Sequence, residues 1–305
     1  MKIQVILLLL PLISNTACMS PITELTNPDV EVIGHRGHVS AYPENTIEGF
    51  LSAVAIGAGA LELDLVISAD QKVVVSHEPY MKAVYMLTPD GKRINKKKER
   101  EYNLFEMSYD SIRKYKSGRI TNSRFRMQRQ TDAHKPLLDV VIDTVMSFTK
   151  NRDLEPVTFF LEIKSDPSDY GKFQPQPEEF VTMVMKILEE KKLENRVVLM
   201  SFDSNILHAV KERYPHIKVS YLLYRKGIDE GLKELNFQPE YIGPYHKQLS
   251  NTETVTSLQQ KGIKVVPWTV NRRRDILKMF GYGVDGIISD HPERVLQEKN
   301  RLKAE

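Results

Sequence analysis

Seven ionisable side chains share one setting, because each lies at or near the end of a short apolar segment. They are His35, Arg36, Glu62, Asp64, His77, Glu162 and Lys164. Side chains alternate along a strand, so positions 62 and 64 project from one face and positions 162 and 164 do the same. Charges that point inward from runs such as LELDL and FFLEIK are costly unless they are paired or bind a metal. The pattern therefore predicts a shared polar site.

These residue types are suited to chemistry on an anion. Three carboxylates without a thiolate favour a hard divalent cation with oxygen ligands, Mg²⁺ or Ca²⁺. Two histidines suit acid and base catalysis near neutral pH. Arg36 and Lys164 supply fixed positive charge for an anionic oxygen. A cation, two imidazoles and two basic side chains around one point indicate phosphoryl chemistry.

Short apolar segments that could be strands alternate with helical patterns over most of the chain. The nine strand candidates are VIGH, ALELDLV, KVVVSHE, VTFFLEIK, RVVLMSF, KVSYLL, YIGPY, KVVPWTV and DGIISD. Amphipathic segments such as NTIEGFLSAVAIGA and LLDVVIDTVMSFTK lie between most of them. This alternation predicts a parallel sheet with helical crossovers. The composition, 41% hydrophobic and 27% charged, is that of an ordinary globular protein.

Two of the strand candidates are too close together to be parallel neighbours. Only ISADQK separates ELDLV from VVVSHE, whereas a parallel crossover needs about a dozen residues or more. We therefore expect an antiparallel hairpin with its turn near Ala69 and Asp70, which places Asp64 opposite approximately residue 77. Eight parallel strands remain, and they predict a (β/α)8 TIM barrel with its site at the carboxyl ends of the strands. A doubly wound open sheet is the second choice, because GHRG lacks the GxGxxG spacing.

A basic insertion interrupts the predicted barrel, which extends over residues 31–297. Residues 78–136 contain fifteen Lys and Arg against seven Asp and Glu, so this stretch is near +8 while the rest of the chain is near −5. Because it follows His77, we expect it to overhang the mouth of the barrel. The charge could meet anionic lipid headgroups, draw in a phosphate-bearing substrate, or simply form a solvated surface. Nucleic acid is disfavoured because no reader motif accompanies the charge.

The first residues have the pattern of an export signal. Lys2 precedes the apolar run IQVILLLLPLI, which is too short to span a bilayer, and a small-residue segment follows. Cys18, the only cysteine, predicts a lipidated N-terminus after a signal at residues 1–17, with a linker at 18–30. Asn15 stands where a lipoprotein signal usually has Leu, so a plain secretory signal is the alternative. The expected location is the bacterial periplasm or cell envelope.

The ordered motifs HRG, PENT, ELD, VSHE, EIK, SFD, PWTVN and DGIISDHP resemble the glycerophosphodiester phosphodiesterase family, within the phospholipase C-like phosphodiesterase superfamily. The resemblance extends from residue 32 to about 295. It implies that His35 and His77 are the catalytic acid and base and that Arg36 and Lys164 contact phosphate. It also implies one divalent cation on Glu62, Asp64 and Glu162, and a pocket wall of Phe202 and Trp268. We interpret Asn45 and Thr46 as helix caps and Asp290 as a residue that holds a loop.

The resemblance implies hydrolysis of a small-molecule glycerophosphodiester to an alcohol and glycerol 3-phosphate through a cyclic phosphate. Two alternatives stay open: a phospholipase D-like enzyme for lysophospholipids or sphingolipids, and a noncatalytic phosphate-binding surface lipoprotein. A metal-dependent amidohydrolase is disfavoured, because His35 and His38 have HxxH rather than HxH spacing. Two positions depart from the family pattern. Glu78 follows His77 where aspartate is usual, and Gln71 replaces a turn glycine.

Overall fold

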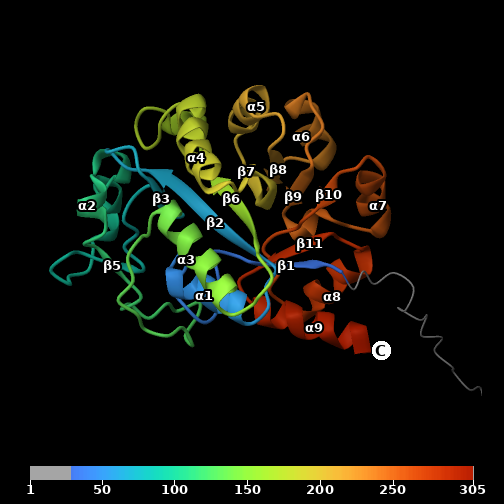
Figure 1. Ribbon diagram of the computed structural model, residues 1–305, viewed down its shortest axis with the longest axis horizontal. Helices are drawn as coiled ribbons and strands as arrows, with labels where there is room; N and C mark the ends of the chain where they lie inside the picture. The colour runs from blue at the N-terminus through green and yellow to red at the C-terminus, as the bar shows by residue number, and fades with distance from the viewer. Residues whose placement is uncertain (1–28, 305) are drawn as a thin grey trace, which may run out of the picture.

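A barrel of parallel strands surrounded by helices forms the centre of the computed structural model, which describes residues 29–304 (Figure 1). Its eight strands, in chain order, are β1 (Glu31–Gly34), β2 (Ala60–Ile67), β6 (Thr158–Ile163), β7 (Val197–Ser201), β8 (Lys218–Leu223), β9 (Tyr241–Pro244), β10 (Lys264–Val265) and β11 (Gly286–Ser289). Their order around the barrel is β10-β9-β8-β7-β6-β2-β1-β11. Backbone hydrogen bonds from Asp285 N to Val265 O (2.9 Å) and from Ile288 N to Pro267 O (3.1 Å) connect the two ends. The predicted (β/α)8 fold is confirmed. The predicted signal, Cys18 and nearly all of the linker lie outside the described residues.

The expected antiparallel hairpin is present beside the barrel. Strand β3 (Val73–Val75) pairs with β2, with Leu65 opposite Val75. The amide of Ser76 donates to the carbonyl of Asp64 at 2.9 Å, so the residue opposite Asp64 is Ser76, one position before the predicted neighbour. His77 directly follows Ser76. Its charge is one of the nearby charges that lower the pKa of Asp64.

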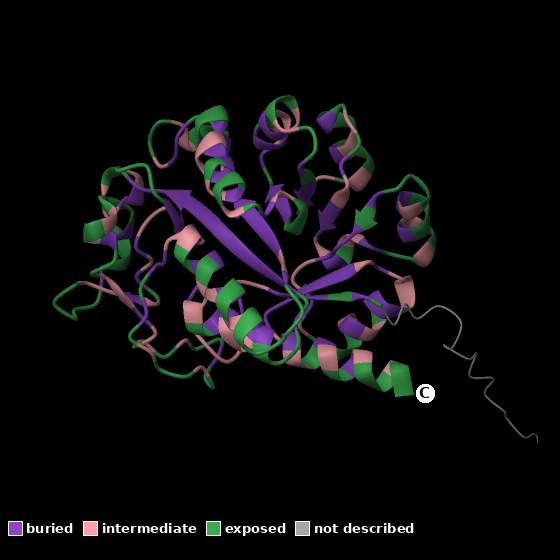
Figure 2. Ribbon diagram, in the orientation of Figure 1, coloured by how far each residue is buried: buried purple, intermediate pink, exposed green. Residues whose placement is uncertain are grey.

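Among the described residues, eight helices cover the outside of the barrel, and their buried faces pack on the strands (Figure 2). They are α1 (Ile47–Ala55), α3 (Leu138–Asn151), α4 (Pro177–Lys191), α5 (Ser204–Arg213), α6 (Ile228–Leu235), α7 (Thr252–Gln260), α8 (Arg273–Tyr282) and α9 (Pro292–Ala304). The sequence patterns did not identify α6 or α9. Helix α6 is only eight residues long, with Ile228, Leu232 and Leu235 packed against the core, and the buried face of α9 includes the charged Glu298. Within residues 29–304, no helix combines the length and apolar character needed to cross a bilayer.

Two layers of side chains fill the inside of the barrel. The lower layer is apolar and consists of Ile33, Ala60, Phe160, Val198, Met200, Leu222, Val266 and Ile288, with Tyr241 and Trp268 against it. Glu62 and Glu162 come two residues after Ala60 and Phe160, so strand alternation places both carboxylates above this layer. All of β2 is buried, which forces its acidic side chains to find partners inside the protein (Figure 2).

The segment 78–136 packs beside the hairpin through an apolar cluster of its own. It contains helix α2 (Tyr109–Ile112) and a small antiparallel pair, β4 (Met86–Leu87) and β5 (Lys116–Ser117). The cluster joins Val66 and Val74 of the hairpin to residues of the segment, namely Met81, Ala83, Met86, Ile94, Leu104 and Ile112. This second core fixes the segment next to the carboxyl ends of the strands.

Candidate active site

Three carboxylates meet at the carboxyl ends of β2 and β6. Asp64 is the direct neighbour of Glu162 in the parallel register of these strands, and Glu62 lies two residues earlier on the same face as Asp64. One oxygen of each of the three lies within 4.8 Å of the others, and all three residues are buried. Burial, followed by repulsion from Asp64 and Glu162, raises the pKa of Glu62 well above its ordinary value. Carboxylates this close favour either a proton on one of them or a bound cation.

The carboxylate cluster fits a hard divalent cation. Asp64 Oδ1 is buried and accepts no hydrogen bond from residues 29–304, and the Lys164 ammonium lies 3.7 Å away. Lys164 is closer to Glu162, at 2.6 Å. When all are ionised, Arg36 and Lys164 supply two positive charges against these three carboxylates and Glu44, so negative charge is in excess beside the unused oxygen. Mg²⁺ and Ca²⁺ prefer such an all-oxygen set.

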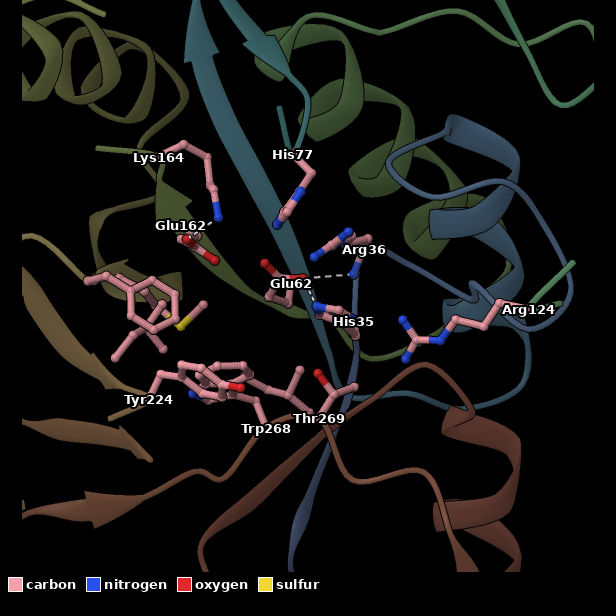
Figure 3. Close-up of a pocket in the computed structure, with 14 residues that line it drawn as sticks. His35, Arg36, Glu62, His77, Arg124, Glu162, Lys164, Tyr224, Trp268 and Thr269 are labelled. Carbon is pink, nitrogen blue, oxygen red and sulfur yellow. Dashed lines mark hydrogen bonds and ion pairs between the residues drawn. The ribbon is translucent and has the colours of Figure 1, made fainter. Parts of the chain in front are cut away.

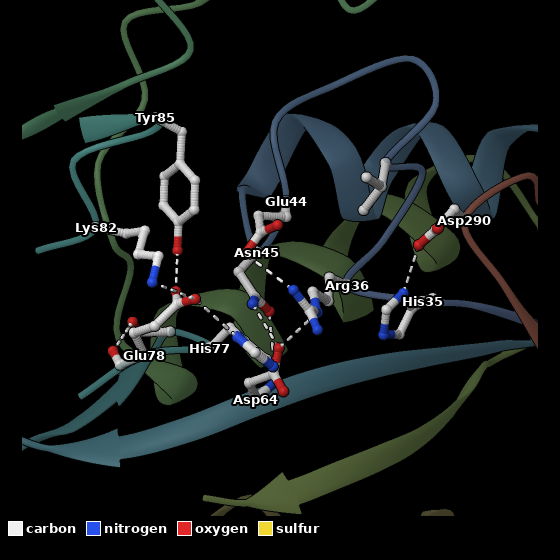
Figure 4. Close-up of polar contacts among 12 residues, drawn as sticks. His35, Arg36, Glu44, Asn45, Asp64, His77, Glu78, Lys82, Tyr85 and Asp290 are labelled. Carbon is white, nitrogen blue, oxygen red and sulfur yellow. Dashed lines mark hydrogen bonds and ion pairs between the residues drawn. The ribbon is translucent and has the colours of Figure 1, made fainter. Parts of the chain in front are cut away.

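The turn after β1 points Arg36 toward the carboxylates (Figure 4). Arg36 has a φ of +51°, which directs its amide to Glu62 Oε2 at 2.7 Å. Its guanidinium lies 3.1 Å from Asp64 and 3.2 Å from Glu44. Burial alone would raise the pKa of Asp64, but the nearby charges, Arg36 foremost, lower it below its ordinary value. Arg36 therefore keeps this carboxylate ionised.

Asn45 belongs to the site, which corrects its interpretation as a helix cap. Its side-chain amide donates to Asp64 Oδ2 at 2.8 Å, and its φ is +55° (Figure 4). Thr46 alone caps α1, accepting from the amide of Gly49 at 3.2 Å. Because the positive φ of Asn45 is known only from the folded turn, the sequence alone did not indicate this contact.

His35 is held by Asp290, which we had interpreted as a loop residue. Strand β1 pairs with β11, and His35 Nδ1 lies 2.5 Å from Asp290 Oδ1. Asn271 donates to the other oxygen of Asp290 at 2.7 Å. Burial would raise the pKa of Asp290, but the charge of His35 above all lowers it, so the carboxylate is ionised. His35 Nε2 remains directed inward, 3.9 Å from Glu62.

His77 has a carboxylate partner of its own (Figure 4). Its Nδ1 lies 3.1 Å from Glu78 Oε1, and the hydroxyl of Tyr85 donates to Glu78 Oε2. Burial would raise the pKa of Glu78, but the nearby His77 ring, foremost, and the hydroxyl of Tyr85 lower it to about 2. Glu78 is thus an ionised partner in the place where the family usually has aspartate.

Both histidines open into one cavity of about 640 Å³ (Figure 3). Arg36, Lys164, Glu62 and Glu162 line it, and the fully buried Asp64 lies behind Arg36 and Lys164. An aromatic wall of Phe202, Tyr224 and Trp268 closes another side. Trp268 donates from Nε1 to Gly243 O at 2.7 Å and meets Phe202 edge-on at 5.3 Å.

The structure therefore brings all nine predicted site residues to one cavity or its floor. Four further residues were not identified as site residues from the sequence: Asn45, Asp290, Arg124 and Tyr224. Tyr224 directly follows β8, so the carboxyl-end rule could have found it. Arg124 lies in the inserted segment and lines the cavity.

Comparisons with known proteins agree with this geometry. Residues 35–294 match the glycerophosphoryl diester phosphodiesterase family. The chain is 29% identical over 266 residues to a glycerophosphodiester phosphodiesterase of Caldanaerobacter subterraneus, covering 87% of this chain and 96% of the relative.

Solved structures give the same result. A Silicibacter pomeroyi protein assigned to the glycerophosphoryl diester phosphodiesterases superposes with a TM-score of 0.81 at 28% identity, covering 91% of this chain and 95% of that one. An Oleispira antarctica phosphodiesterase, solved with the product sn-glycerol-3-phosphate, has the same fold, with a TM-score of 0.69 at 20% identity over 89% of this chain and 96% of that one. Because the family match covers most of the chain, the protein belongs to the glycerophosphoryl diester phosphodiesterase family, whose members are phosphoric diester hydrolases.

Proposed function

We propose that the protein hydrolyses glycerophosphodiesters to an alcohol and glycerol 3-phosphate, with a divalent cation and two histidines. The observation that carries the proposal is the convergence of three buried carboxylates and two carboxylate-paired histidines on one cavity. Glu62, Asp64 and Glu162 would hold Mg²⁺ or Ca²⁺, which when bound polarises a phosphoryl oxygen and offsets developing negative charge.

The basic side chains orient the phosphate. Arg36 is fixed by Glu44 and Asp64, and Lys164 by Glu162, so both keep their positions before substrate arrives. Preorganised charges of this kind stabilise a phosphorane-like transition state without a reorganisation cost. Both residues line the cavity beside the histidines.

The histidines exchange the protons. In each ring Nδ1 faces a carboxylate, Asp290 for His35 and Glu78 for His77, which leaves Nε2 for substrate. One Nε2 takes the proton from the vicinal glycerol hydroxyl as it attacks phosphorus, and the other protonates the departing alcohol. Water then opens the cyclic phosphate with the proton transfers reversed. General acid or base catalysis by each histidine typically raises the reaction rate roughly 10²- to 10⁴-fold.

An assay on a panel of glycerophosphodiesters tests the proposal. Purified protein should release glycerol 3-phosphate from at least one panel member, EDTA should abolish release, and Mg²⁺ or Ca²⁺ should restore it. Turnover that is unaffected by EDTA would reject the cation, and an inert panel would reject the substrate class. His77→Ala should bind substrate and not turn it over. If wild type also binds without turnover, the protein is a phosphate-binding module.

The aromatic wall favours one alternative substrate. Phe202 and Tyr224 are 38% and 51% exposed at the cavity, an apolar surface that could cover the start of an acyl chain. A phospholipase D-like activity on lysophospholipids or sphingolipids would use the same catalytic groups. Turnover of a lysolipid but not of glycerophosphocholine would establish it in place of the first proposal.

We also propose that the protein acts in the bacterial cell envelope, anchored by a lipid on Cys18. The support is the sequence of residues 1–18 alone. Membrane-fraction protein from an expressing bacterium should carry a lipid by mass spectrometry, and Cys18→Ser should release it. A soluble wild-type protein without lipid would indicate the plain secretory signal.

A further inference from the structure

Arg124 comes from the inserted segment and reaches the catalytic cavity. Its guanidinium donates from Nη2 to Asp290 Oδ2 at 3.0 Å, next to the oxygen that holds His35. Figure 3 shows the side chain directed toward the site from the side of His35 opposite to the aromatic wall. The cavity therefore has an apolar aromatic side and a basic side.

The segment that carries Arg124 is attached to the barrel through the residues that directly follow it. Phe125 is buried and packs against the ring of His291 at 5.9 Å. Gln128 donates from Nε2 to the carbonyls of Val39 at 2.6 Å and Tyr42 at 3.0 Å. The amide of Arg129 donates to Ala41 at 2.8 Å. These contacts position the Arg124 backbone over the turn that bears His35.

The two side chains of the Arg124–Asp290 ion pair differ greatly in their exposure to solvent. The side chain of Arg124 is 68% exposed, whereas that of Asp290 is 3% exposed. The carboxylate oxygens of Asp290 are occupied by His35, Asn271 and Arg124, and Asp290 does not line the cavity. Arg124 uses only Nη2 in this contact, and the rest of the fork has no hydrogen-bond partner among residues 29–304 that the structure records. A molecule in the cavity meets N–H donors and positive charge.

We propose that Arg124 is a specificity-determining residue that binds a second anionic group on the substrate. This inference rests on the proposed phosphodiesterase function and narrows its substrate class to glycerophosphodiesters with an additional phosphate. While the scissile phosphate lies among Arg36, Lys164 and the histidines, a second phosphate would accept hydrogen bonds from the open edge of Arg124. Phosphate matches the planar guanidinium fork.

A matched pair of substrates isolates this contact. Glycerophosphoglycerol has one phosphate, and bis(glycerophospho)glycerol adds a second glycerophosphate to the same skeleton. The quantity of interest is the ratio of kcat/KM for the doubly charged to the singly charged compound, because any general damage to His35 or Asp290 cancels in it. Arg124→Ala should lower this ratio about tenfold, which corresponds to ~1.4 kcal/mol. Arg124→Lys keeps the charge without the fork and should give an intermediate ratio.

The control is Arg126→Ala, which removes the same charge from the same segment at an exposed residue that does not line the cavity. Its ratio should equal that of wild type, and the wild-type ratio should fall as salt is added.

An equal loss of kcat/KM on both substrates in Arg124→Ala would overturn the proposal and make Arg124 a support for Asp290 alone. An unchanged ratio, or an equal change in Arg126→Ala, would overturn it too. If no glycerophosphodiester is turned over by wild type, the proposed function itself fails.

Discussion

Asp64 is the side chain on which the contacts of the site converge. It is fully buried, and Arg36, Asn45 and Lys164 all approach its carboxylate. A buried carboxylate is tolerated only when its oxygens are satisfied, yet Oδ1 accepts no hydrogen bond within the part of the chain that the structure describes. With Glu62 and Glu162 beside it, the unused oxygen is best explained as a ligand position for a cation.

Removing one ligand charge should therefore remove activity and leave the fold intact. Glu162→Gln keeps the shape of the side chain and loses the charge that pairs with Lys164. We expect kcat/KM to fall by about 10²-fold or more, the loss typical of one electrostatic contact to the transition state. Asp143→Asn, an exposed residue of α3 paired with Lys191, provides the control for a lost surface charge. Near-normal kinetics of Glu162→Gln at saturating cation would contradict the ligand role.

Asp290 should act on the rate through His35. Asp290→Asn leaves a side chain of the same size but no negative charge opposite His35 Nδ1. We expect kcat to fall roughly 10- to 100-fold, in the range seen when a partner that orients a histidine is altered, and KM to change little. Steady-state kinetics separate the two constants. A rise in KM at unchanged kcat would instead indicate that Asp290 contributes to substrate binding.

At the scale of elements, local rules explain what the sequence could predict. Strand alternation places Glu62, Asp64 and Glu162 on inward faces, and the short connection before Val73 requires a hairpin, so both features follow from residues close in sequence. The partners of His35 and Asp64 follow from long-range geometry. Asp290 reaches His35 because β11 pairs with β1, and this pairing is known only once the barrel is closed.

The same limit applies to the residues supplied by loops. Asn45 faces Asp64 because its backbone adopts a positive φ, and Arg124 arrives on a segment whose path depends on its own small core. Neither conformation can be predicted from the spacing of apolar residues in the sequence. Helices α6 and α9 were missed for different reasons, since α6 is only eight residues long and the buried face of α9 includes the charged Glu298.

The turn from β1 into α1 depends on Gly37. Its φ is +89°, and a Cβ there would lie 2.8 Å from the backbone carbon of Gly49 in α1. Gly37→Ala should combine backbone strain with this clash and destabilise the protein by about 1–3 kcal/mol or more. Gly91→Ala is the matched control, because its φ is +80° and nothing lies within 4 Å of the added carbon. Equal midpoints in urea unfolding for the two variants would show that the clash contributes nothing.

At the scale of the whole molecule, ionised carboxylates make stability depend on pH. Glu78 has its pKa lowered to about 2 from an ordinary value of 4.5, so its contribution to stability is complete above pH 4.5 and is lost as pH falls toward 2. We expect the free energy of unfolding of wild type to drop more steeply across this interval than that of Glu78→Gln. Chemical denaturation at stepped pH measures both slopes. Parallel curves would mean that Glu78 gains no stabilisation from His77 and Tyr85.

The cluster of Glu62, Asp64 and Glu162 has the opposite effect on stability at rising pH, and it makes the stability of the fold depend on a bound cation. Because burial and neighbouring charges raise the pKa of Glu62, folding holds this group more readily as the neutral acid, and the protein without cation loses stability as pH rises above 4.5. A cation that binds only the folded state would offset this repulsion and add about 2.7 kcal/mol at a concentration of 100 times Kd.

Mg²⁺ or Ca²⁺ should therefore raise the melting temperature of EDTA-treated protein at pH 7. The increase should shrink toward pH 4, where protons compete for the same oxygens, and Glu162→Gln should show a smaller increase because one ligand charge is gone. Differential scanning calorimetry over a cation titration measures all three effects. An equal increase in wild type and Glu162→Gln would place the stabilising cation elsewhere on the surface, since only a site that uses Glu162 can lose affinity through that substitution.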